Sequence, residues 1–319
     1  MAKVLVTARS VAASAEGRAI LEAAGHEMIA HVGDGVWPEA EMLRVITGMD
    51  AVIAGLDEMT AKVIEAGAAS LKIIARNGAG YNNVNVEAAT RLGIPVTLAP
   101  GTNTVSVCEL AFGLMLSLTR HIPAQNAEVR QGGWKRILGG ELYGKVLGVI
   151  GTGHIGSEVI KRAHAFGMNI VAFDVAQRPE LCEKYNVRYI ELEAVFREAD
   201  FLTLHVPSIP ATKNMMNRQT LKLLKETAFV INTARGDLVN EEDLYDALVS
   251  GKLAGYGTDT FVQEPPVEDN RLLKLANVIA TPHCGAYTKE AVARCSVTAA
   301  QEVVRVLAGQ PPLYAVVRR

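Results

Sequence analysis

The stretch KVLGVIGTGHIGSEVIKR, residues 145–162, joins an apolar strand, a glycine turn and the start of a helix. Its turn places Gly151, Gly153 and Gly156 in the pattern GxGxxG. The first glycine permits a tight turn, the second lets the main chain approach a pyrophosphate, and the third lets the helix pack on the strand. Free N–H groups at the helix N-terminus attract the same anion. Because the chain has 28 glycines, the pattern alone is weak, but a strand before it and a helix after it make it predict a dinucleotide site.

The next apolar strand, NIVAFD at residues 169–174, ends in Asp174. An acid at the end of the second strand accepts a hydrogen bond from a ribose hydroxyl, and its charge repels a 2′-phosphate. The sequence therefore predicts NAD rather than NADP as the cofactor. Arg178 follows four residues later, and its positive charge could soften this exclusion. The order of strand, turn, helix and acid disfavours the alternative, a glycine turn without a ligand beside a surface aspartate.

Short runs rich in Val, Ile and Leu alternate with helical patterns on both sides of this stretch. Such alternation is typical of an α/β protein, in which helices cover both faces of parallel sheets. The segment APGTN at residues 99–103 breaks the pattern and predicts a crossing between two domains. Helices predicted at 104–118 and 289–308 could carry the chain out of the first domain and back, which would make that domain discontinuous. Strands are predicted at residues 3–7, 27–32, 51–54, 71–75 and 95–98 before the crossing, and at 145–150, 170–174, 201–205, 228–232, 253–259 and 278–281 after it.

The composition excludes several classes of partner. The 319 residues include 32 basic and 34 acidic side chains, a formal charge of −2, so the chain lacks the basic footprint that nucleic acid binding requires. Its most apolar helical stretch, residues 110–118, is about half of the roughly 20 residues that span a membrane. The four cysteines form no CxxC pair, which argues against a zinc site or a disulfide framework. We therefore expect a cytoplasmic protein with no signal peptide and no metal, nucleic acid or membrane partner.

Three residues of the second series could act beside a bound nicotinamide. Oxidation of an alcohol needs a base for the hydroxyl proton, and a carboxylate substrate needs a cation. Arg235 follows the strand AFVINTA, at the sheet edge where doubly wound folds bind ligands. His283 lies in the loop TPHCGAYT, and Glu264 precedes two prolines in FVQEPP. A carboxylate beside the imidazole would fix its tautomer and favour the imidazolium that forms during oxidation.

Each of these residues also has a simpler interpretation. Arg235 could be a surface arginine that pairs with Asp237 or Glu241. His283 could be a hydrogen-bonded loop histidine and Glu264 a solvated acid. Only their combination with the dinucleotide turn favours a catalytic role.

The motifs together resemble those of the D-isomer-specific 2-hydroxyacid dehydrogenase family, in the same order and at the family's spacing. They are GTGHIG with Asp174, HVP at 205–207, NTARGD at 232–237, DTFVQEPP at 259–266 and TPHCGAYT at 281–288. The set is very specific, and the resemblance covers essentially the whole chain. Within the family, the chain is most similar to the short D-3-phosphoglycerate dehydrogenases that lack a regulatory domain.

The resemblance implies a fold, a cofactor and an assembly. It implies two doubly wound parallel-sheet domains: a flavodoxin-like substrate domain of residues 1–100 and 288–319, and a Rossmann NAD-binding domain of residues 101–287. It further implies NAD as the cofactor, a small 2-hydroxy or 2-keto acid as the substrate, and a homodimer.

The resemblance also implies roles for individual residues. Arg235 would bind the substrate carboxylate and carbonyl, His283 would be the acid and base, and Glu264 would orient the histidine. Asp259 would reach the nicotinamide carboxamide. The rest of the cofactor site would comprise Gly151, Gly153, His154, Ile155, Gly156, Asp174, Val206, Pro207, Thr233 and Ala234, and the substrate would also meet Arg76 and the loop Asn77, Gly78, Ala79 and Gly80.

The identity of the substrate stays open. Gly55 and Leu56 stand where phosphoglycerate enzymes often have an arginine for the phosphate. Arg76 and Arg136 match family arginines, and two cations could still hold a phosphate, but each could also be structural. The candidates are therefore 3-phosphoglycerate, glyoxylate or hydroxypyruvate, and other small D-2-hydroxy acids. Rival functions are a dinucleotide-sensing, corepressor-like protein without turnover and an oxidiser of phosphite or formate.

Overall fold

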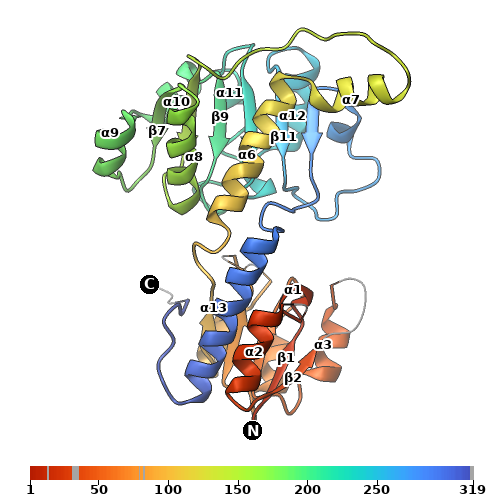
Figure 1. Cartoon of the computed structure of the whole chain (residues 1–319), viewed down its shortest axis with the longest axis vertical. Helices are drawn as coiled ribbons and strands as arrows, with labels where there is room; N and C mark the ends of the chain where they lie inside the picture. Colours follow the sequence, from red (N-terminus) through yellow and green to blue (C-terminus); the bar gives the residue numbers. More distant parts are fainter. Residues whose placement is uncertain (13, 31–35, 79, 82, 317–319) are drawn as a thin grey trace. The chain divides into compact units, whose positions relative to one another are not determined.

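The computed structural model describes residues 1–12, 14–30, 36–78, 80–81 and 83–316. The chain forms two compact units, which Figure 1 shows with the sequence colours. The first unit comprises Met1–Asn103 and Tyr287–Arg319, and the second comprises Thr104–Ala286. The chain leaves the first unit at the segment 99–103, where Pro100 and Gly101 end the regular pattern.

A five-stranded parallel sheet forms the centre of the first unit, in the order β2-β1-β3-β4-β5. This is the flavodoxin-like strand order. Its inner strands read as continuous apolar runs because helices cover both of their faces. The predicted strand at 27–32 begins as expected, but its last two residues lie outside the described part of the chain. The strands are β1 (Lys3–Val6), β2 (Glu27–Ala30), β3 (Ala51–Ala54), β4 (Ile73–Arg76) and β5 (Val96–Thr97).

Helices pack around this sheet in the first unit. The last of them, α13, begins at the N-cap Thr288, whose hydroxyl accepts a hydrogen bond from the Ala291 N–H at 3.1 Å. Small residues along α13, such as Ala299 and Ala300, are fully buried where the helix packs on α2, β3 and β4. The helices are α1 (Arg9–Ala12), α2 (Ala15–Ala23), α3 (Glu39–Val45), α4 (Ala61–Gly67), α5 (Val86–Arg91) and α13 (Lys289–Leu307).

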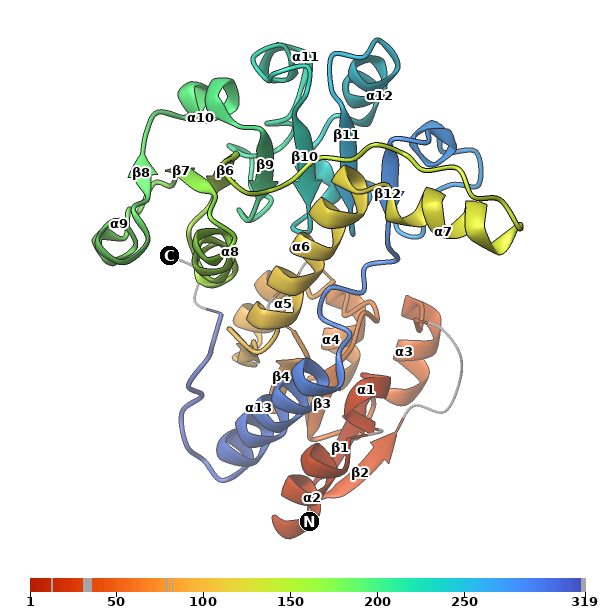
Figure 2. The ribbon, with the colours of Figure 1, turned by 45° about the horizontal axis from the view of Figure 1, so that its top comes forward.

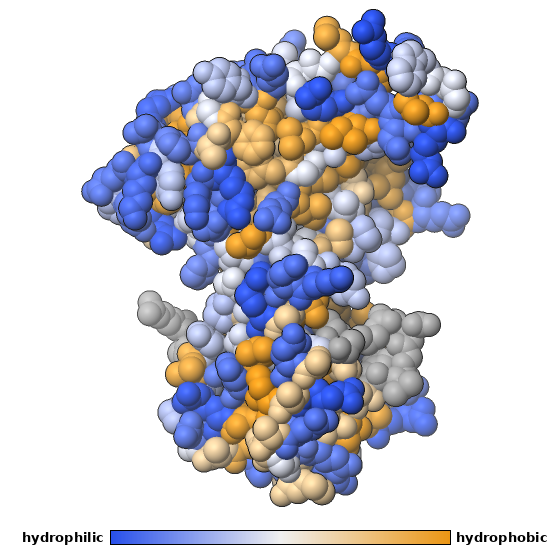
Figure 3. Space-filling view, viewed as in Figure 1, coloured by the Kyte–Doolittle hydropathy of each residue, from blue (hydrophilic) through white to orange (hydrophobic). Residues whose placement is uncertain are grey.

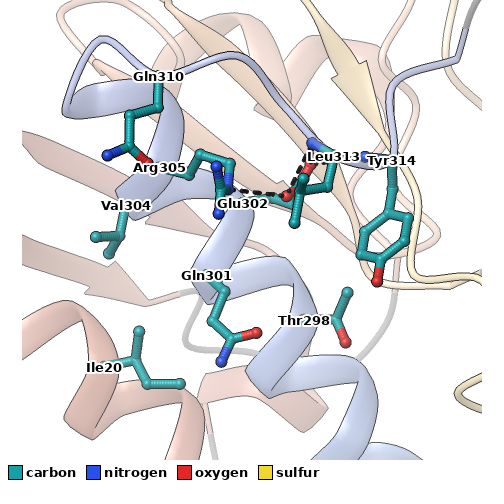
Figure 4. Close-up of a pocket in the computed structure, with 9 residues that line it drawn as sticks. All are labelled: Ile20, Thr298, Gln301, Glu302, Val304, Arg305, Gln310, Leu313 and Tyr314. Atoms are coloured by element: carbon teal, nitrogen blue, oxygen red, sulfur yellow. Dashed lines mark hydrogen bonds and ion pairs between the residues drawn. The ribbon is translucent and has the colours of Figure 1, made fainter.

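A buried carboxylate holds the segment that follows α13. Glu302 is 1% exposed and accepts hydrogen bonds from the N–H groups of Leu313 and Tyr314 at 3.0 and 3.1 Å. The segment then pairs with the free edge of β5, where the Val316 N–H donates to the Val96 carbonyl at 2.7 Å. A cavity of about 430 Å³ lies between this segment, α13 and Ile20 of α2. Figure 4 shows the side chains that line it. None of the predicted site residues that the structure describes lines it.

A seven-stranded parallel sheet forms the centre of the second unit, in the order β12-β11-β10-β9-β6-β7-β8. If β6 is strand 1, the order from β8 to β11 is the dinucleotide-binding order 3-2-1-4-5-6, and β12 adds one further strand. The edge strand β8 was not predicted, because its two residues, Arg188 and Tyr189, do not form an apolar run. The strands are β6 (Val146–Ile150), β7 (Asn169–Phe173), β8 (Arg188–Tyr189), β9 (Phe201–Leu204), β10 (Phe229–Asn232), β11 (Gly255–Thr258) and β12 (Val278–Ala280).

Helices cover both faces of the second sheet. Figure 2 shows α6 and α8 on one side of the row of strands and α10, α11 and α12 on the other, and two separate apolar clusters fill these faces. The helices are α6 (Thr104–Thr119), α7 (Ile122–Arg130), α8 (His154–Ala165), α9 (Pro179–Tyr185), α10 (Leu192–Glu198), α11 (Arg218–Leu221) and α12 (Glu241–Val249), with 3₁₀ turns η1 (Gly236–Leu238) and η2 (Arg271–Lys274).

The predicted fold class, an α/β protein with two doubly wound parallel sheets, is confirmed. In the described part of the chain, no single helix is both long and apolar enough to cross a membrane. Helices α6 and α7 together have the length and composition, but the chain bends by 64° between them. The predicted cytoplasmic location stays a prediction.

The third glycine of the turn gives a test of the fold. A Cβ at Gly156 would lie 2.0 Å from the Gly151 carbonyl oxygen, so Gly156→Ala must push the helix away from the strand. We expect this change to lower the free energy of unfolding by at least about 2 kcal/mol. Gly153→Ala is the matched control, because a Cβ there meets no atom within 4 Å, and we expect it to stay within about 0.5 kcal/mol of wild type. Equal stability of the two variants in urea titrations would contradict the packing described here.

Candidate active site

The glycine turn after β6 is shaped to receive an anion. Gly151 has a φ of +93°, and a Cβ there would lie 2.6 Å from the His205 carbonyl oxygen, so only glycine is accommodated. Gly153 is the N-cap of α8 and offers no side chain to the first N–H groups of this 12-residue helix. These N–H groups, together with the open space at Gly153, match what a dinucleotide pyrophosphate needs. His154 and Ile155 begin the helix at this point.

Asp174 is tied to the same turn. Its Oδ2 accepts hydrogen bonds from the Thr152 N–H at 2.6 Å and the Thr152 hydroxyl at 3.1 Å, and its Oδ1 accepts from the Ala176 N–H at 3.0 Å. The guanidinium of Arg178 donates to the Ser157 hydroxyl at 2.8 Å and to Glu180 at 2.9 Å. Asp174 and Arg178, the two charged residues that the sequence analysis weighed for cofactor selectivity, therefore both lie around the start of α8.

His283 and Glu264 form a direct pair. The Nδ1 of His283 lies 2.6 Å from Oε2 of Glu264, and the other oxygen of Glu264 accepts from the Phe261 N–H at 3.0 Å. Burial raises the pKa of Glu264, but the hydrogen bonds from His283 and Phe261 and the charges of His283 and Arg235 outweigh it, so the pKa lies below the usual glutamate value. A carboxylate that stays ionised fixes Nδ1–H as the donor and leaves Nε2 as the nitrogen that exchanges a proton.

A buried carboxylate holds the loop that carries His283. Asp259 is 1% exposed, and its oxygens accept from the Thr281 hydroxyl at 2.6 Å, the Cys284 N–H at 2.8 Å and the Gly285 N–H at 2.7 Å. His283 itself has a φ of +50°, in the left-handed region that non-glycine residues rarely adopt. The bonds on both sides of it keep the backbone in this conformation. The resemblance implied a role for Asp259 toward the carboxamide, whereas here its oxygens face the histidine loop.

Arg235 is placed by the turn after β10. The fully buried Asn232 donates from its side chain to the Arg235 carbonyl at 2.8 Å, and its amide oxygen accepts from the Ala234 N–H at 3.1 Å. A Cβ at Gly236 would lie 2.0 Å from the carbonyl carbon of Phe261, so this turn touches the loop that carries Glu264. That close approach explains why the charge of Arg235 lowers the pKa of Glu264.

The simpler interpretation of Arg235, a surface pair with an acid, does not match the contacts of those acids. Asp237 accepts a hydrogen bond from the Ser208 hydroxyl. Glu241 accepts from the Val262 N–H and the Asn270 side chain, each at 3.2 Å. The guanidinium of Arg235 donates to the Ala234 carbonyl at 2.6 Å.

The remaining predicted cofactor residues lie at the ends of neighbouring strands. Val206, after β9, packs against the turn at Gly151, with 2.9 Å between its Cγ1 and an ideal Cβ there. Pro207 is exposed, and Ala234 is partly buried after β10. The buried Thr233 hydroxyl has no hydrogen-bond partner within the described residues, so it is available to bond a ligand.

His205 is a second histidine close to the turn. Its Nε2 lies 2.9 Å from the Thr203 hydroxyl, and burial lowers the pKa of His205 to about 3. The ring therefore stays neutral near pH 7 and does not compete with His283 as the group that gains and loses a proton.

The substrate residues predicted at 76–80 belong to the first unit. Arg76 is 8% exposed and donates from Nε to the Asn83 side chain at 3.1 Å and from Nη1 to the Asn77 carbonyl at 2.7 Å. The Asn77 N–H donates to the Ala54 carbonyl at 2.9 Å, and Gly78 and Gly80 are partly buried. Ala79 lies outside the described residues. Arg76 therefore organises its own loop in the first unit.

Comparison with known proteins places the chain in a family. Residues 112–285 match the D-isomer specific 2-hydroxyacid dehydrogenase, NAD binding domain. The chain is 44% identical over 274 residues to D-3-phosphoglycerate dehydrogenase of Methanocaldococcus jannaschii, covering 85% of this chain and 52% of that protein. It is also 44% identical over 272 residues to hydroxypyruvate reductase of Thermotoga maritima, covering 84% and 88%. The crystal structure of TT0316 protein from Thermus thermophilus matches with a TM-score of 0.91 and 34% identity over 99% of this chain and 100% of that one.

The chain therefore belongs to the D-isomer specific 2-hydroxyacid dehydrogenase family. The predicted family, its oxidoreductase class and its NAD cofactor are confirmed. The chain spans about half the length of the M. jannaschii relative and most of the T. maritima relative. Because the two relatives are named for different substrates, they do not identify the acid on which this chain acts.

Sequence reasoning missed several residues that hold the site together. Asn232 and Gly236 flank Arg235 within NTARGD, and Thr281 opens TPHCGAYT. An asparagine that directly ends an apolar strand, as Asn232 does, is a signal in the sequence for such a brace; in the structure its side chain is fully buried and needs hydrogen-bond partners. The packing of Gly236 on Phe261 carries no local signal, because it joins two separate loops.

Asp259 gives a test of the histidine loop. In Asp259→Asn, an amide NH₂ must face one of the N–H or O–H donors that now point at the carboxylate, so a buried donor loses its acceptor. We expect the free energy of unfolding to fall by about 1–3 kcal/mol in chemical denaturation. Thr281→Val, which removes only one of the three donors, should cost less. Wild-type stability of Asp259→Asn would show that the loop does not depend on these bonds.

Proposed function

We propose that the chain is an NAD-dependent dehydrogenase that interconverts a small D-2-hydroxy acid and its 2-keto acid. The observation that carries the proposal is the 2.6 Å contact between Nδ1 of His283 and Oε2 of Glu264. The charge of Arg235 helps to lower the pKa of the same glutamate. These groups follow β10, β11 and β12, strands of the sheet that also carries the glycine turn and Asp174. We also propose that the second unit binds the cofactor and the first unit contributes to the substrate site.

The residues of the second unit supply the groups that the reaction needs. When bound, NAD accepts the hydride from C2 of the hydroxy acid, and NADH returns it to the keto acid. As the hydride leaves, Nε2 of His283 takes the hydroxyl proton, and the C2–O bond becomes a carbonyl. Glu264 holds Nδ1–H and stabilises the imidazolium. Arg235 presents a planar fork that binds the substrate carboxylate at two points.

The proposed substrate class is a short 2-keto acid without a phosphate. Arg76, one of the two arginines weighed for a phosphate, already donates to Asn83 and to the carbonyl of Asn77. These bonds commit Nε and Nη1 of the guanidinium to its own loop, so a phosphate would have to share this arginine with Asn83 and Asn77. Hydroxypyruvate and glyoxylate need no cation beyond the one that binds their carboxylate.

The first test of this proposal is NADH oxidation with hydroxypyruvate, glyoxylate, pyruvate and phosphohydroxypyruvate, scored by kcat/KM. We expect turnover, with the phosphate ester as a poorer substrate than hydroxypyruvate. His283→Ala should lower kcat by about 10²–10⁴-fold, since the general acid is lost. Arg235→Ala should chiefly raise KM, by about 10–100-fold, since it loses charged hydrogen bonds to the carboxylate.

Three results would contradict the proposal. Wild-type turnover by His283→Ala would remove the histidine from the mechanism. Binding of NADH without turnover of any acid would favour the dinucleotide-sensing alternative. Faster turnover of the phosphate ester than of hydroxypyruvate would reverse the substrate assignment.

The Glu264 carboxylate gives a pH prediction of definite sign. Its pKa lies below the usual value, so it is ionised at neutral pH and stabilises the imidazolium of His283. Glu264→Gln removes this charge, and reduction, which needs the imidazolium, should then fail at a lower pH than in wild type, by about one pH unit or more. The kcat/KM profile for keto acid reduction from pH 5 to 9 measures this shift. An unchanged profile, or a shift to higher pH, would contradict the pairing.

We further propose that the chain forms a homodimer through α7 and the segment that follows it, which we call the arm (residues 122–143). Trp134 and Leu138 of the arm are 84% and 95% exposed. Ile122, Val129 and Tyr143 are exposed on the same segment, and Figure 3 shows apolar side chains over the face that α6 crosses in Figure 1. Exposed apolar patches of this kind mark protein interfaces.

Light scattering after gel filtration tests the homodimer. We expect twice the chain mass for wild type and a monomer for the double variant Trp134→Glu with Leu138→Glu, because two charges cannot be buried unpaired in an apolar interface. Val249→Glu, at an exposed apolar position of α12, is the matched control and should stay dimeric. A monomeric wild type at micromolar concentration would refute the proposal.

A further inference from the structure

A chain of hydrogen bonds ends on the Asp174 carboxylate. The Arg178 N–H donates to the Tyr189 hydroxyl at 3.2 Å, and the Tyr189 hydroxyl donates to the Thr152 hydroxyl at 2.9 Å. The Thr152 hydroxyl donates in turn to Oδ2 of Asp174 at 3.1 Å, beside the bond of 2.6 Å from the Thr152 N–H. This hydrogen-bond chain joins the turn after β6, the end of β7, the edge strand β8 and the N-cap of α9.

The Asp174 carboxylate, at the end of this hydrogen-bond chain, fixes which group donates in every bond. An ionised carboxylate only accepts, so the single proton of the Thr152 hydroxyl must point at Asp174. The Thr152 oxygen then accepts from Tyr189, whose own oxygen is left to accept from the Arg178 N–H. Each hydroxyl thus donates once and accepts once, and reversal of any one bond would leave a donor facing a donor.

The position of Thr152 makes this arrangement costly to break. Its side chain is fully buried, so a hydroxyl turned away from Asp174 would find no water. Both bonds from Thr152 reach Oδ2, and the Ala176 N–H holds Oδ1 at 3.0 Å. The carboxylate is therefore fixed from two sides at the end of β7.

A cation lies at the first turn of α8, the helix that follows the glycine turn to which Asp174 is bonded. The Arg178 side chain is 41% exposed and reaches the Ser157 hydroxyl, in the first turn of α8, at 2.8 Å. Its pair with Glu180 is on the surface, where such pairs contribute little free energy. A 2′-phosphate could therefore gain this arginine, provided that the Asp174 carboxylate moved out of the way.

We propose that Thr152 and Tyr189 are positioning residues that determine the selectivity of the site for NAD over NADP. They act by holding the Asp174 carboxylate where it meets the ribose hydroxyls and repels a 2′-phosphate. This inference rests on the proposed function, because it assigns to two further residues a part in the choice of cofactor. Loss of the Thr152 hydroxyl removes one of the three hydrogen bonds that hold Asp174, and loss of the Tyr189 hydroxyl removes the partner that fixes the Thr152 hydroxyl. Either loss weakens the hold on the carboxylate, so that it can turn aside and Arg178 can meet the phosphate.

The test compares Kd values for NADH and NADPH, from fluorescence titration, with kcat/KM for the two cofactors. Thr152→Val keeps the shape and the backbone N–H but removes the hydroxyl, and we expect the preference for NADH to fall about tenfold. Thr152→Ser keeps the hydroxyl and should restore it. Tyr189→Phe should lower the preference about threefold, and should have no further effect when Thr152→Val is already present, because both act through one chain.

Tyr185→Phe is the matched control. Tyr185 is a partly buried tyrosine on α9, it packs edge-on against His164, and it is not a member of the hydrogen-bond chain. Its variant should keep the wild-type preference. Thermal unfolding of all variants separates a change of selectivity from a loss of fold, and Tyr189→Phe carries the test if Thr152→Val does not fold.

The outcomes separate the inference from the proposed function. If wild type prefers NADH and Thr152→Val keeps that preference, the inference is overturned while the proposed function stands. If Thr152→Ser loses the preference as Thr152→Val does, the hydroxyl is not the cause and the inference is overturned as well. If wild type binds neither dinucleotide, the proposed function fails and the inference fails with it.

Discussion

The parallel direction of the second sheet is the constraint on which the site depends. Strands β6, β9, β10, β11 and β12 all run the same way, so the turns that follow them leave from one edge. The glycine turn, Val206, Arg235, Glu264 and His283 follow these five strands and reach that edge from distant parts of the sequence. An antiparallel strand among them would send its residue to the opposite edge. The topology of the sheet alone therefore brings these residues to one edge.

Buried carboxylates and amides then fix the loops at this edge. Asp259 holds the histidine loop with three hydrogen bonds, Asn232 holds the turn before Arg235, and Asp174 is held against the glycine turn. Each group is buried or partly buried, so its bonds are made in a medium that strengthens them and penalises their loss. Loops are the mobile part of most folds, and this bracing fixes the positions of His283 and Arg235, the base and the cation that we propose for the reaction.

The sequence predicted most of the fold and the chemical members of the site. Apolar runs indicated the strands, apart from the two-residue β8, and the glycine turn with Asp174 indicated the cofactor. The pairing of His283 with Glu264 could be proposed only from the chemistry that a dinucleotide site needs and from the family resemblance, because residues 19 positions apart on two loops show no local period. The braces were not predictable for the same reason: Gly236 packs on Phe261, and Tyr189 bonds Thr152, across separate elements. Such contacts depend on tertiary packing rather than on local propensity.

The fate of the hydride tests most directly whether the base, the cation and the cofactor act together at this sheet edge. The protein would be incubated with hydroxypyruvate and NADH that carries deuterium at both C4 positions, and the product analysed by NMR and mass spectrometry. We expect a D-2-hydroxy acid with one deuterium on C2, because in the proposed arrangement the substrate carbonyl lies beside the nicotinamide while His283 protonates its oxygen. A product with no deuterium at C2, or the L-isomer, would contradict the arrangement of base, cation and cofactor at this sheet edge.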